Sequence, residues 1–174
     1  MAHQSGALSA KLANFKPKVA WDAHLAQAIV DQKSSLQGAM LPILHDLQDA
    51  FGYVDSSVVP QIAEALNVSK AEVHGVISFY HDFRSTPAGK HVLKICRAEA
   101  CQSMGCESLV TYLAHTHHLA PGETSKDGGL TIDTVYCLGN CALSPAALLD
   151  GELIGRLDRD GLDQIVLDAT GGRS

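Results

Sequence analysis

The feature that most constrains this chain is a set of four cysteines arranged in two close pairs. The first pair is Cys96 and Cys101, with four residues between them, and the second is Cys137 and Cys141, with three. A fifth cysteine, Cys106, follows the first pair. Without a secretion signal, five thiols are more often metal ligands or redox groups than disulfides, and an odd number argues further against a disulfide framework. The cysteines therefore predict a metal or redox centre.

The overall composition is that of an ordinary soluble globular protein. Of the 174 residues, 46% are hydrophobic and 18% are charged. The net charge of -6 and the lack of a basic stripe argue against nucleic acid as a partner. No apolar run is long enough to span a bilayer, and the N-terminal residues lack the apolar core of a secretion signal. We therefore expect no membrane insertion and a cytoplasmic location.

The first part of the chain is predicted to be helical. Residues 1–20 are polar with little apolar periodicity, which predicts a flexible N-terminal tail. Residues 21–84 are expected to form a bundle of four short helices, because apolar residues recur there at helical spacing. The helices are expected at about 21–37, 40–51, 57–66 and 69–80.

Capping residues support these helix boundaries. Asp22 is expected to cap the first helix, Gly52 to end the second and Asn67 to end the third, while Ser69 and Glu72 fit a capping box that opens the fourth. The apolar stripe of the first helix is expected at Leu25, Ala28, Ile29 and Leu36. That of the second is expected at Ile43, Leu44, Leu47 and Phe51.

Beyond a Ser-, Pro- and Gly-containing loop at residues 84–90, the pattern changes to alternating strands and helices. A strand at 91–95, a helix at about 103–118 and a strand at 130–136 predict a parallel unit with a right-handed crossover. Two short strands at 146–149 and 153–157 flank Asp150-Gly151, a hairpin turn, and a helix at 161–169 closes the chain. The predicted fold is α+β, with the helical bundle (21–84) followed by a thioredoxin-like domain (85–174) whose mixed sheet has about four strands.

Both cysteine pairs begin where a predicted strand ends. Parallel neighbouring strands end at the same edge of a sheet, so the four thiolates are expected to converge. A [2Fe-2S] cluster suits four cysteines at these spacings, because each pair can hold one iron. Structural zinc usually takes Cys-x2-Cys pairs, and a dithiol enzyme needs Cys-x-x-Cys, which is absent. A four-cysteine, zinc-stapled binding module and a thiol oxidoreductase are the alternatives.

Several nearby groups are expected to tolerate the negative charge of a cluster. The helix after Cys101 directs its N-terminus and free N–H groups at the site. Gly105 and Gly139 are expected to let backbone amides approach the sulfurs closely. Arg97 is the nearest cation in the sequence, and a solvated loop residue is the alternative interpretation of it.

The sequence resembles the thioredoxin-like [2Fe-2S] ferredoxin subunits of NADH-linked oxidoreductases, such as the small cluster-bearing subunit of complex I. The resemblance implies that Cys96, Cys101, Cys137 and Cys141 are the cluster ligands. It also implies a direct partner subunit that carries flavin mononucleotide and the NAD site, and no substrate pocket in this chain. The matching stretches are Leu41–Leu44, Phe51–Val54, Val76–Tyr80, Cys96–Cys101, Gly105, Cys137–Cys141 and Ser144-Pro145.

Within that family, the run from Cys96 to Cys106 is most similar to the gamma subunits of NAD-dependent, molybdenum-containing formate dehydrogenase. Complex I subunits typically carry Thr and Pro between the first two cysteines, where this chain has Arg-Ala-Glu-Ala. This branch implies a catalytic partner subunit that holds a molybdenum cofactor. Equivalent subunits of complex I or of an NAD-reducing hydrogenase are the alternatives.

Other conspicuous residues have plainer interpretations. Cys106 is expected to be a buried thiol rather than a fifth ligand. His115, His117 and His118 are expected to face water at a helix C-terminus rather than bind a metal, and His74 and His81 have no assigned role. Phe79, Tyr80 and Phe83 are expected in the core rather than at a partner interface. Pro145 precedes a strand, where a trans peptide is the general expectation and a thioredoxin-like fold favours cis.

Overall fold

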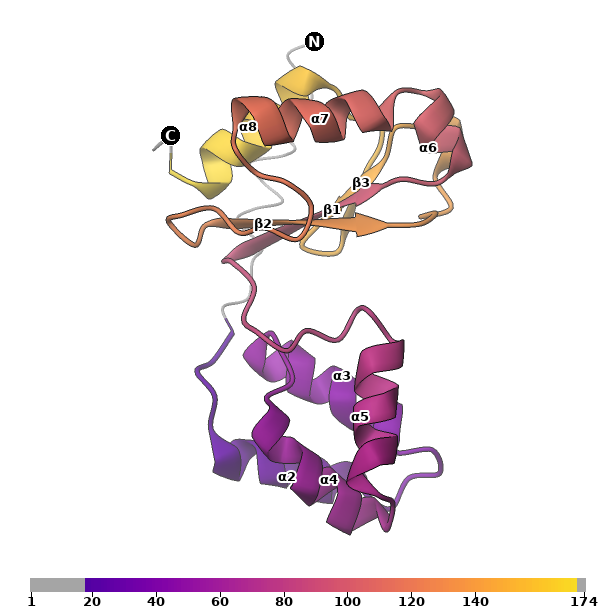
Figure 1. Cartoon of the computed structure of the whole chain (residues 1–174), viewed down its shortest axis with the longest axis vertical. Helices are drawn as coiled ribbons and strands as arrows, with labels where there is room; N and C mark the ends of the chain where they lie inside the picture. The colour runs from indigo at the N-terminus through magenta and orange to yellow at the C-terminus, as the bar shows by residue number, and fades with distance from the viewer. Residues whose placement is uncertain (1–17, 172–174) are drawn as a thin grey trace. The chain divides into compact units, whose positions relative to one another are not determined.

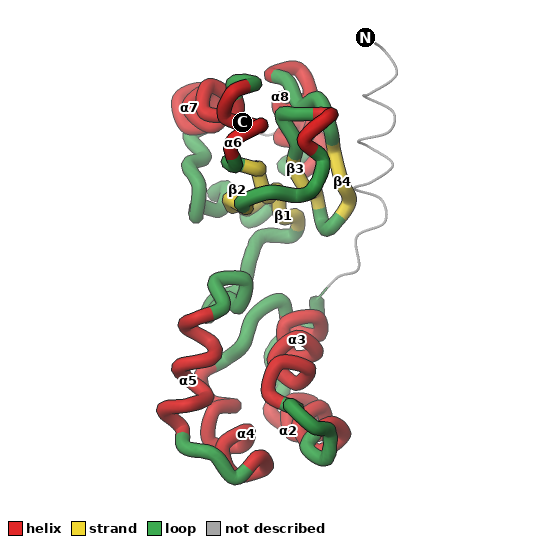
Figure 2. Tube along the Cα trace, turned by 90° about the vertical axis from the view of Figure 1, so that its right-hand side faces the viewer, coloured by secondary structure: helices red, strands yellow, loops and turns green. Residues whose placement is uncertain are grey.

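The computed structural model describes residues 18–171. Residues 1–17, and with them most of the expected N-terminal tail, lie outside the described residues. Contacts within the chain divide it into two compact units, and the chain passes from one to the other between residues 87 and 88. One unit is helical and the other contains a sheet (Figures 1 and 2).

The helical unit contains the four expected helices. They surround a core to which each of them contributes, and α3 supplies most of its largest fully buried side chains, namely Ile43, Leu44 and Leu47. A short 3-10 helix, Ser56–Val58, precedes the third. The helices are α2 (Ala23–Lys33), α3 (Met40–Phe51), α4 (Val59–Leu66) and α5 (Lys70–Phe79).

The predicted capping residues occupy the helix ends. The Asp22 side chain accepts hydrogen bonds from two backbone N–H groups of the first turn of α2. Gly52 and Asn67 end α3 and α4 in the left-handed conformation, with φ of 85° and 52°. Ser69 and Glu72 form the reciprocal capping box of α5. Local chemistry therefore sets these boundaries.

The predicted apolar stripe of α2 is confirmed only for Ile29, which is partly buried and packs against the core. Leu25 and Leu36 are 42% and 51% exposed, and Ala28 is exposed as well, whereas Ala26 and Val30 are completely buried. Apolar residues occur on more than one side of this helix, so periodicity alone does not identify the face that packs. The small side chain of Ala26 lies on the face that packs into the core of the unit.

The expected core position of the aromatic run is confirmed for only one residue. Phe83 is 7% exposed and its ring lies 5.1 Å from that of His45. Phe79 and Tyr80 are 75% and 43% exposed. The reason is that α5 ends at Phe79 and Tyr80 adopts an extended backbone, which redirects the chain before Phe83 enters the core.

The second unit is built on a mixed four-stranded sheet in the order β2-β1-β3-β4. Strands β1 and β2 are parallel, with His91 opposite Leu130 and Cys96 opposite Val135. The β3–β4 hairpin extends the sheet antiparallel, and both turn residues, Asp150 and Gly151, have positive φ. This topology confirms the predicted sheet. The strands are β1 (His91–Cys96), β2 (Leu130–Val135), β3 (Ala147–Leu149) and β4 (Glu152–Ile154).

The expected single helix between β1 and β2 is two helices, α6 (Glu99–Ser103) and α7 (Cys106–Thr116). Gly105 separates them with a φ of 90°, a conformation that glycine adopts without strain. The closing helix α8 (Arg159–Ala169) begins two residues before its expected start, where Asp158 caps it. Figure 1 shows α7 and α8 over one face of the sheet, and their apolar side chains share its core.

Candidate metal centre

The first cysteine pair links the end of a strand to a short helix. Cys96 is the last residue of β1, and Cys101 lies inside α6 rather than before a helix as expected. Both side chains are buried, at 2% and 3% exposure. The Cys101 thiol hydrogen-bonds to the Cys96 sulfur, so the two sulfurs are direct neighbours.

The second pair lies in the loop that follows β2. Cys137 comes two residues after the strand, beyond the exposed Tyr136, and has a φ of 71°. Cys141 begins the 3-10 helix Cys141–Leu143. The thiol of Cys141 hydrogen-bonds to Cys137, and both residues are exposed.

The parallel pairing of β1 with β2 brings the two pairs to the same edge of the sheet. Backbone N–H groups of Cys137 and Leu138 donate hydrogen bonds to the Cys96 sulfur, which joins the second loop to the first pair. The negative charges of Cys101 and Cys96 also raise the pKa of Cys141, so the first pair lies within electrostatic range of the second. The four predicted ligands therefore converge in space, although their role as ligands stays a prediction.

The pKa values of two of these thiols show how the site treats negative charge. Burial alone raises the pKa of Cys96, but hydrogen bonds from the Ala98 amide, the Cys101 thiol and the amides of Cys137 and Leu138 outweigh it, so the net pKa is lowered. The pKa of Cys141 is raised, mainly by its hydrogen bond to Cys137 and the charge of that neighbour. The site stabilises a thiolate at Cys96, whereas a second thiolate at Cys141 is disfavoured by the negative charge of its neighbours. A bound cation would offset that charge.

The donor set consists of two thiol pairs, which suits a two-iron cluster. Within residues 18–171, no group of three or more His, Cys, Asp or Glu side chains is arranged to hold one metal ion. Two hydrogen-bonded pairs of free thiols are present, and each iron of a [2Fe-2S] cluster takes two protein ligands. The zinc alternative requires four thiolates around one ion.

Two glycines near the site adopt backbone conformations that other residues rarely adopt. A Cβ atom at Gly139 would meet no other atom within 4 Å, and one at Gly105 would meet only the Ser108 hydroxyl at 3.6 Å. Both residues have positive φ, at 73° and 90°. The backbone conformation therefore favours glycine at both positions. The expected approach of their amides to the sulfurs stays a prediction.

Arg97 is paired rather than freely solvated. Its Nε donates to Oε1 of Glu107 and its terminal nitrogen donates to Oε2, both at 2.8 Å. This hydrogen-bonded ion pair lowers the pKa of the Glu107 carboxyl. The Gln102 side chain also donates to the Arg97 carbonyl at 2.8 Å. The loop between Cys96 and Cys101 is thereby tied to the first turn of α7.

A serine to which the sequence assigned no role contacts both cysteine pairs. Ser144 is 8% exposed, and its hydroxyl donates to the Cys141 carbonyl at 2.8 Å. The Cys101 thiol lies 3.6 Å from the same hydroxyl. The bond from Ser144 to Pro145 is cis, as the fold analogy favoured. The Ser144-Pro145 dipeptide belongs to the stretches that resemble the family, but nothing in the sequence indicated that its hydroxyl faces a cysteine.

Cys106 is completely buried at the first position of α7 and packs against Cys96 and Cys101. Burial is the main cause that raises its pKa, and the charge of Glu107 adds to it. This is the environment of a neutral, buried thiol, as the sequence predicted.

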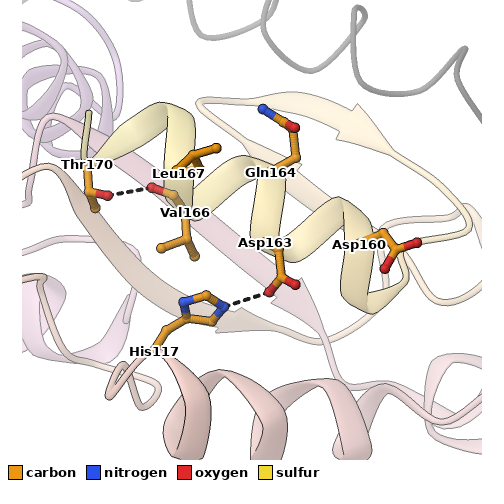
Figure 3. A pocket seen from close by; sticks show the side chains of 7 residues that line it. All are labelled: His117, Asp160, Asp163, Gln164, Val166, Leu167 and Thr170. Carbon is orange, nitrogen blue, oxygen red and sulfur yellow. Dashed lines mark hydrogen bonds and ion pairs between the residues drawn. The ribbon is translucent and has the colours of Figure 1, made fainter. Parts of the chain in front are cut away.

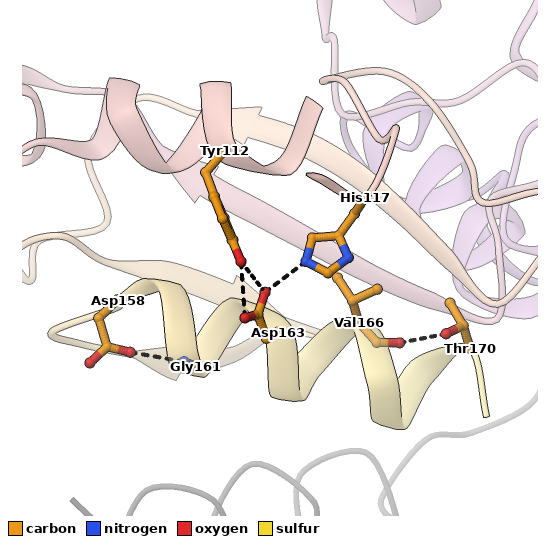
Figure 4. Close-up of polar contacts among 7 residues, drawn as sticks. All are labelled: Tyr112, His117, Asp158, Gly161, Asp163, Val166 and Thr170. Atoms are coloured by element: carbon orange, nitrogen blue, oxygen red, sulfur yellow. Dashed lines mark hydrogen bonds and ion pairs between the residues drawn. The ribbon is translucent and has the colours of Figure 1, made fainter. Parts of the chain in front are cut away.

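A cleft of about 400 Å³ lies elsewhere, between the C-terminal end of α7 and α8 (Figure 3). Its wall includes His117, whose Nε2 lies 2.7 Å from an oxygen of Asp163, and Tyr112 donates to the same carboxylate (Figure 4). The expectation that the histidines face water is therefore wrong for His117, because Asp163 of α8 binds it. His115 and His118 are exposed, as expected.

No helix among residues 18–171 has the length and apolar character needed to span a membrane.

Comparisons with known proteins match the chain over most of its length. The family model described as thioredoxin-like [2Fe-2S] ferredoxin matches residues 26–170. The chain is 30% identical to an NADP-reducing hydrogenase subunit, HndA, of Solidesulfovibrio fructosivorans, over 76% of this chain and 77% of that protein. It is 32% identical to an NADH-quinone oxidoreductase subunit of Rhizobium meliloti, over 75% of this chain and 77% of that protein.

A solved NAD+-reducing [NiFe]-hydrogenase in the air-oxidized state has a similar fold, with a TM-score of 0.65 and 23% identity. The match covers 76% of this chain but only 23% of the hydrogenase chain. At this identity the match supports the fold alone.

Proposed function

The chain belongs to the thioredoxin-like [2Fe-2S] ferredoxin family, and from that premise we propose that Cys96, Cys101, Cys137 and Cys141 hold one [2Fe-2S] cluster. The observation that carries this proposal is the meeting of two hydrogen-bonded thiol pairs at one edge of the sheet. The cluster supplies one-electron transfer when bound. The chain itself positions the sulfurs and supplies amide donors to Cys96.

The proposed role is that of an electron-transfer subunit beside a flavin- and NAD-binding subunit. The relatives named above are subunits of a hydrogenase and of NADH-quinone oxidoreductase, which supports an NAD-linked complex. Flavin mononucleotide and NAD would be bound by that partner, because this chain offers a ligand set for a cluster and no second cofactor motif. The proposed location is cytoplasmic.

We further propose that the complex is a formate dehydrogenase with a molybdenum-containing catalytic subunit. The support is the Arg97–Ala100 run between the first two cysteines, the feature on which the resemblance to that branch rests. Hydrogenase and complex I subunits remain the alternatives, since the named relatives come from those classes.

The helical unit is proposed to be a four-helix bundle that docks the chain onto its larger partners. It would form the domain from 21 to 84, with the cluster domain from 85 to 174. The support is that the residues on α2 to α5 include no cysteine, while the exposed rings of Phe79 and Tyr80 offer a contact surface.

The central test is metal analysis of the purified protein. A [2Fe-2S] protein is brown and contains about two irons and two acid-labile sulfides per chain. Reduction should give a spin-one-half EPR signal. A colourless protein loaded with zinc contradicts the proposal and supports the zinc-stapled module. Dithiol turnover by the iron-free protein would instead support the thiol oxidoreductase.

Co-purification separates the possible complexes. A molybdenum-containing subunit captured with the intact chain supports formate dehydrogenase. A nickel-iron subunit would assign the chain to a hydrogenase, and membrane subunits would assign it to complex I.

A further inference from the structure

Ser144 stands out because one buried hydroxyl contacts both cysteine pairs. Its oxygen lies 3.6 Å from the Cys101 sulfur and 2.8 Å from the Cys141 carbonyl oxygen. The residue is 8% exposed, so water competes little for either contact. The two pairs belong to different segments of the chain, and the hydroxyl lies between them.

The direction of these hydrogen bonds depends on the protonation of Cys101. In the iron-free chain the Ser144 hydroxyl donates its proton to the Cys141 carbonyl and accepts from the Cys101 thiol, whose single proton also faces the Cys96 sulfur. A Cys101 thiolate bound to iron has no proton. The contact then remains a hydrogen bond only if Ser144 donates its own proton to the sulfur.

The backbone around Ser144 permits this change of direction. The Ser144 backbone N–H also points to the Cys141 carbonyl, at 3.3 Å, so that carbonyl keeps a donor when the hydroxyl turns away. The flanking carbonyls of Leu143 and Pro145 accept hydrogen bonds from Arg156 and Leu157. The serine is therefore held in place on both sides while its hydroxyl rotates.

On these grounds, and resting on the proposed cluster, we propose that Ser144 is a positioning residue that donates a hydrogen bond to the Cys101 sulfur and raises the reduction potential of the centre. A hydrogen bond to a ligand sulfur stabilises negative charge there, and the reduced cluster carries more of it than the oxidised one. The hydroxyl therefore favours the reduced state.

The test is an EPR-monitored redox titration of the intact protein and of the variant Ser144→Ala. Removal of the hydroxyl should lower the reduction potential, by up to about a tenfold change in the one-electron equilibrium constant, or ~59 mV. Ser144→Thr keeps the hydroxyl and should restore the potential. Ser103→Ala is the matched control, because that exposed hydroxyl of α6 donates to the Ala100 carbonyl and not to a sulfur.

A second measurement detects the hydrogen bond itself. After brief exchange into deuterium oxide, ENDOR of the reduced protein should show an exchangeable deuteron coupled to the cluster, and Ser144→Ala should lose it. An unchanged potential and an unchanged deuteron signal in a fully loaded Ser144→Ala protein overturn this inference. They leave the proposed function intact.

Failure of the proposed function has a different outcome, because the unmodified protein would then contain no iron and give no EPR signal. If Ser144→Ala does not load iron, Ser144→Gly provides a second variant without a hydroxyl. Loss of iron from both variants would show that the hydroxyl builds the site rather than tunes it, and would also overturn the inference.

Discussion

The guanidinium of Arg97 binds both carboxylate oxygens of Glu107, at 2.8 Å each, immediately beside the proposed ligand Cys96. The cation closest to the site in sequence is therefore matched by an anion from α7. The pair also connects the loop after β1 to the first turn of that helix. Removing either partner changes the charge near the sulfurs, and the two changes have opposite signs.

We expect Arg97→Gln to lower the reduction potential of the centre and Glu107→Gln to raise it. The first variant leaves the Glu107 anion without its cation, and the second leaves Arg97 free to stabilise the reduced cluster. Both side chains are partly exposed, at 32% and 47%, so screening keeps each change below about tenfold in the redox equilibrium constant, or ~59 mV. Redox titrations at low and high salt provide the measurement. Shifts of the same sign in both variants would contradict the electrostatic argument.

We expect a single Cys→Ser substitution at any of the four proposed ligands to reduce the iron content, because one of the two irons then loses one of its two thiolates. Cys106→Ala should keep about two irons per chain, since Cys106 is a buried thiol whose raised pKa favours the neutral form. Iron and sulfide analysis of the five variants provides the measurement. If the Cys106 variant loses iron and one of the other four variants keeps it, Cys106 is a ligand in place of the cysteine substituted in that other variant.

We expect the capping box of α5 to make the helical unit sensitive to acid. Hydrogen bonds from Ser69 lower the pKa of Glu72 below its ordinary value of 4.5. A carboxyl with a lowered folded-state pKa stabilises the fold fully above its unfolded pKa and loses that contribution as pH falls through the folded value. Glu72→Ala should therefore lower the urea midpoint at pH 6, and the difference from the unmodified protein should shrink below pH 4.5. A difference that is independent of pH would exclude this role. Glu64→Ala, on exposed α4 surface, is the control.

We expect alanine substitution of the two phenylalanines near the end of α5, Phe79 and Phe83, to have very different effects on stability. Phe83→Ala removes a buried ring and should destabilise the helical unit by about 3–5 kcal/mol. Phe79→Ala removes a ring that is 75% exposed and should change stability by less than about 0.5 kcal/mol. If the helical unit docks onto partner subunits through this surface, Phe79→Ala should also weaken co-purification. Normal assembly of a stable Phe79→Ala protein would remove this ring from the interface.

The sequence predicted features whose causes are local. The capping residues Asp22, Gly52 and Asn67 act on backbone groups within a turn of themselves, so their chemistry is visible in the sequence. The Asp150-Gly151 turn is local in the same sense, because both residues tolerate positive φ. The alternation of strands and helices then indicated the sheet topology, and with it the edge at which the cysteine pairs meet.

Features that depend on what packs against a segment were not predictable in this way. Leu25 is exposed while Ala26 is buried, because the choice between two apolar faces of α2 is made by its neighbours and not by its own periodicity. Phe79 and Phe83 differ in the same way, since both are apolar but only Phe83 enters the core.

The sequence alone determined the two cysteine pairs and the strands that bring them to a common edge. Only the tertiary structure decided what surrounds the sulfurs: the Ser144 hydroxyl between the pairs, the Arg97–Glu107 ion pair and the amides that donate to Cys96. Hydrogen bonds of this kind join residues far apart in the sequence, and they depend on ångström-scale placement. A residue pattern can therefore predict which atoms bind a cluster, whereas the folded chain sets the charge and hydrogen bonding around them.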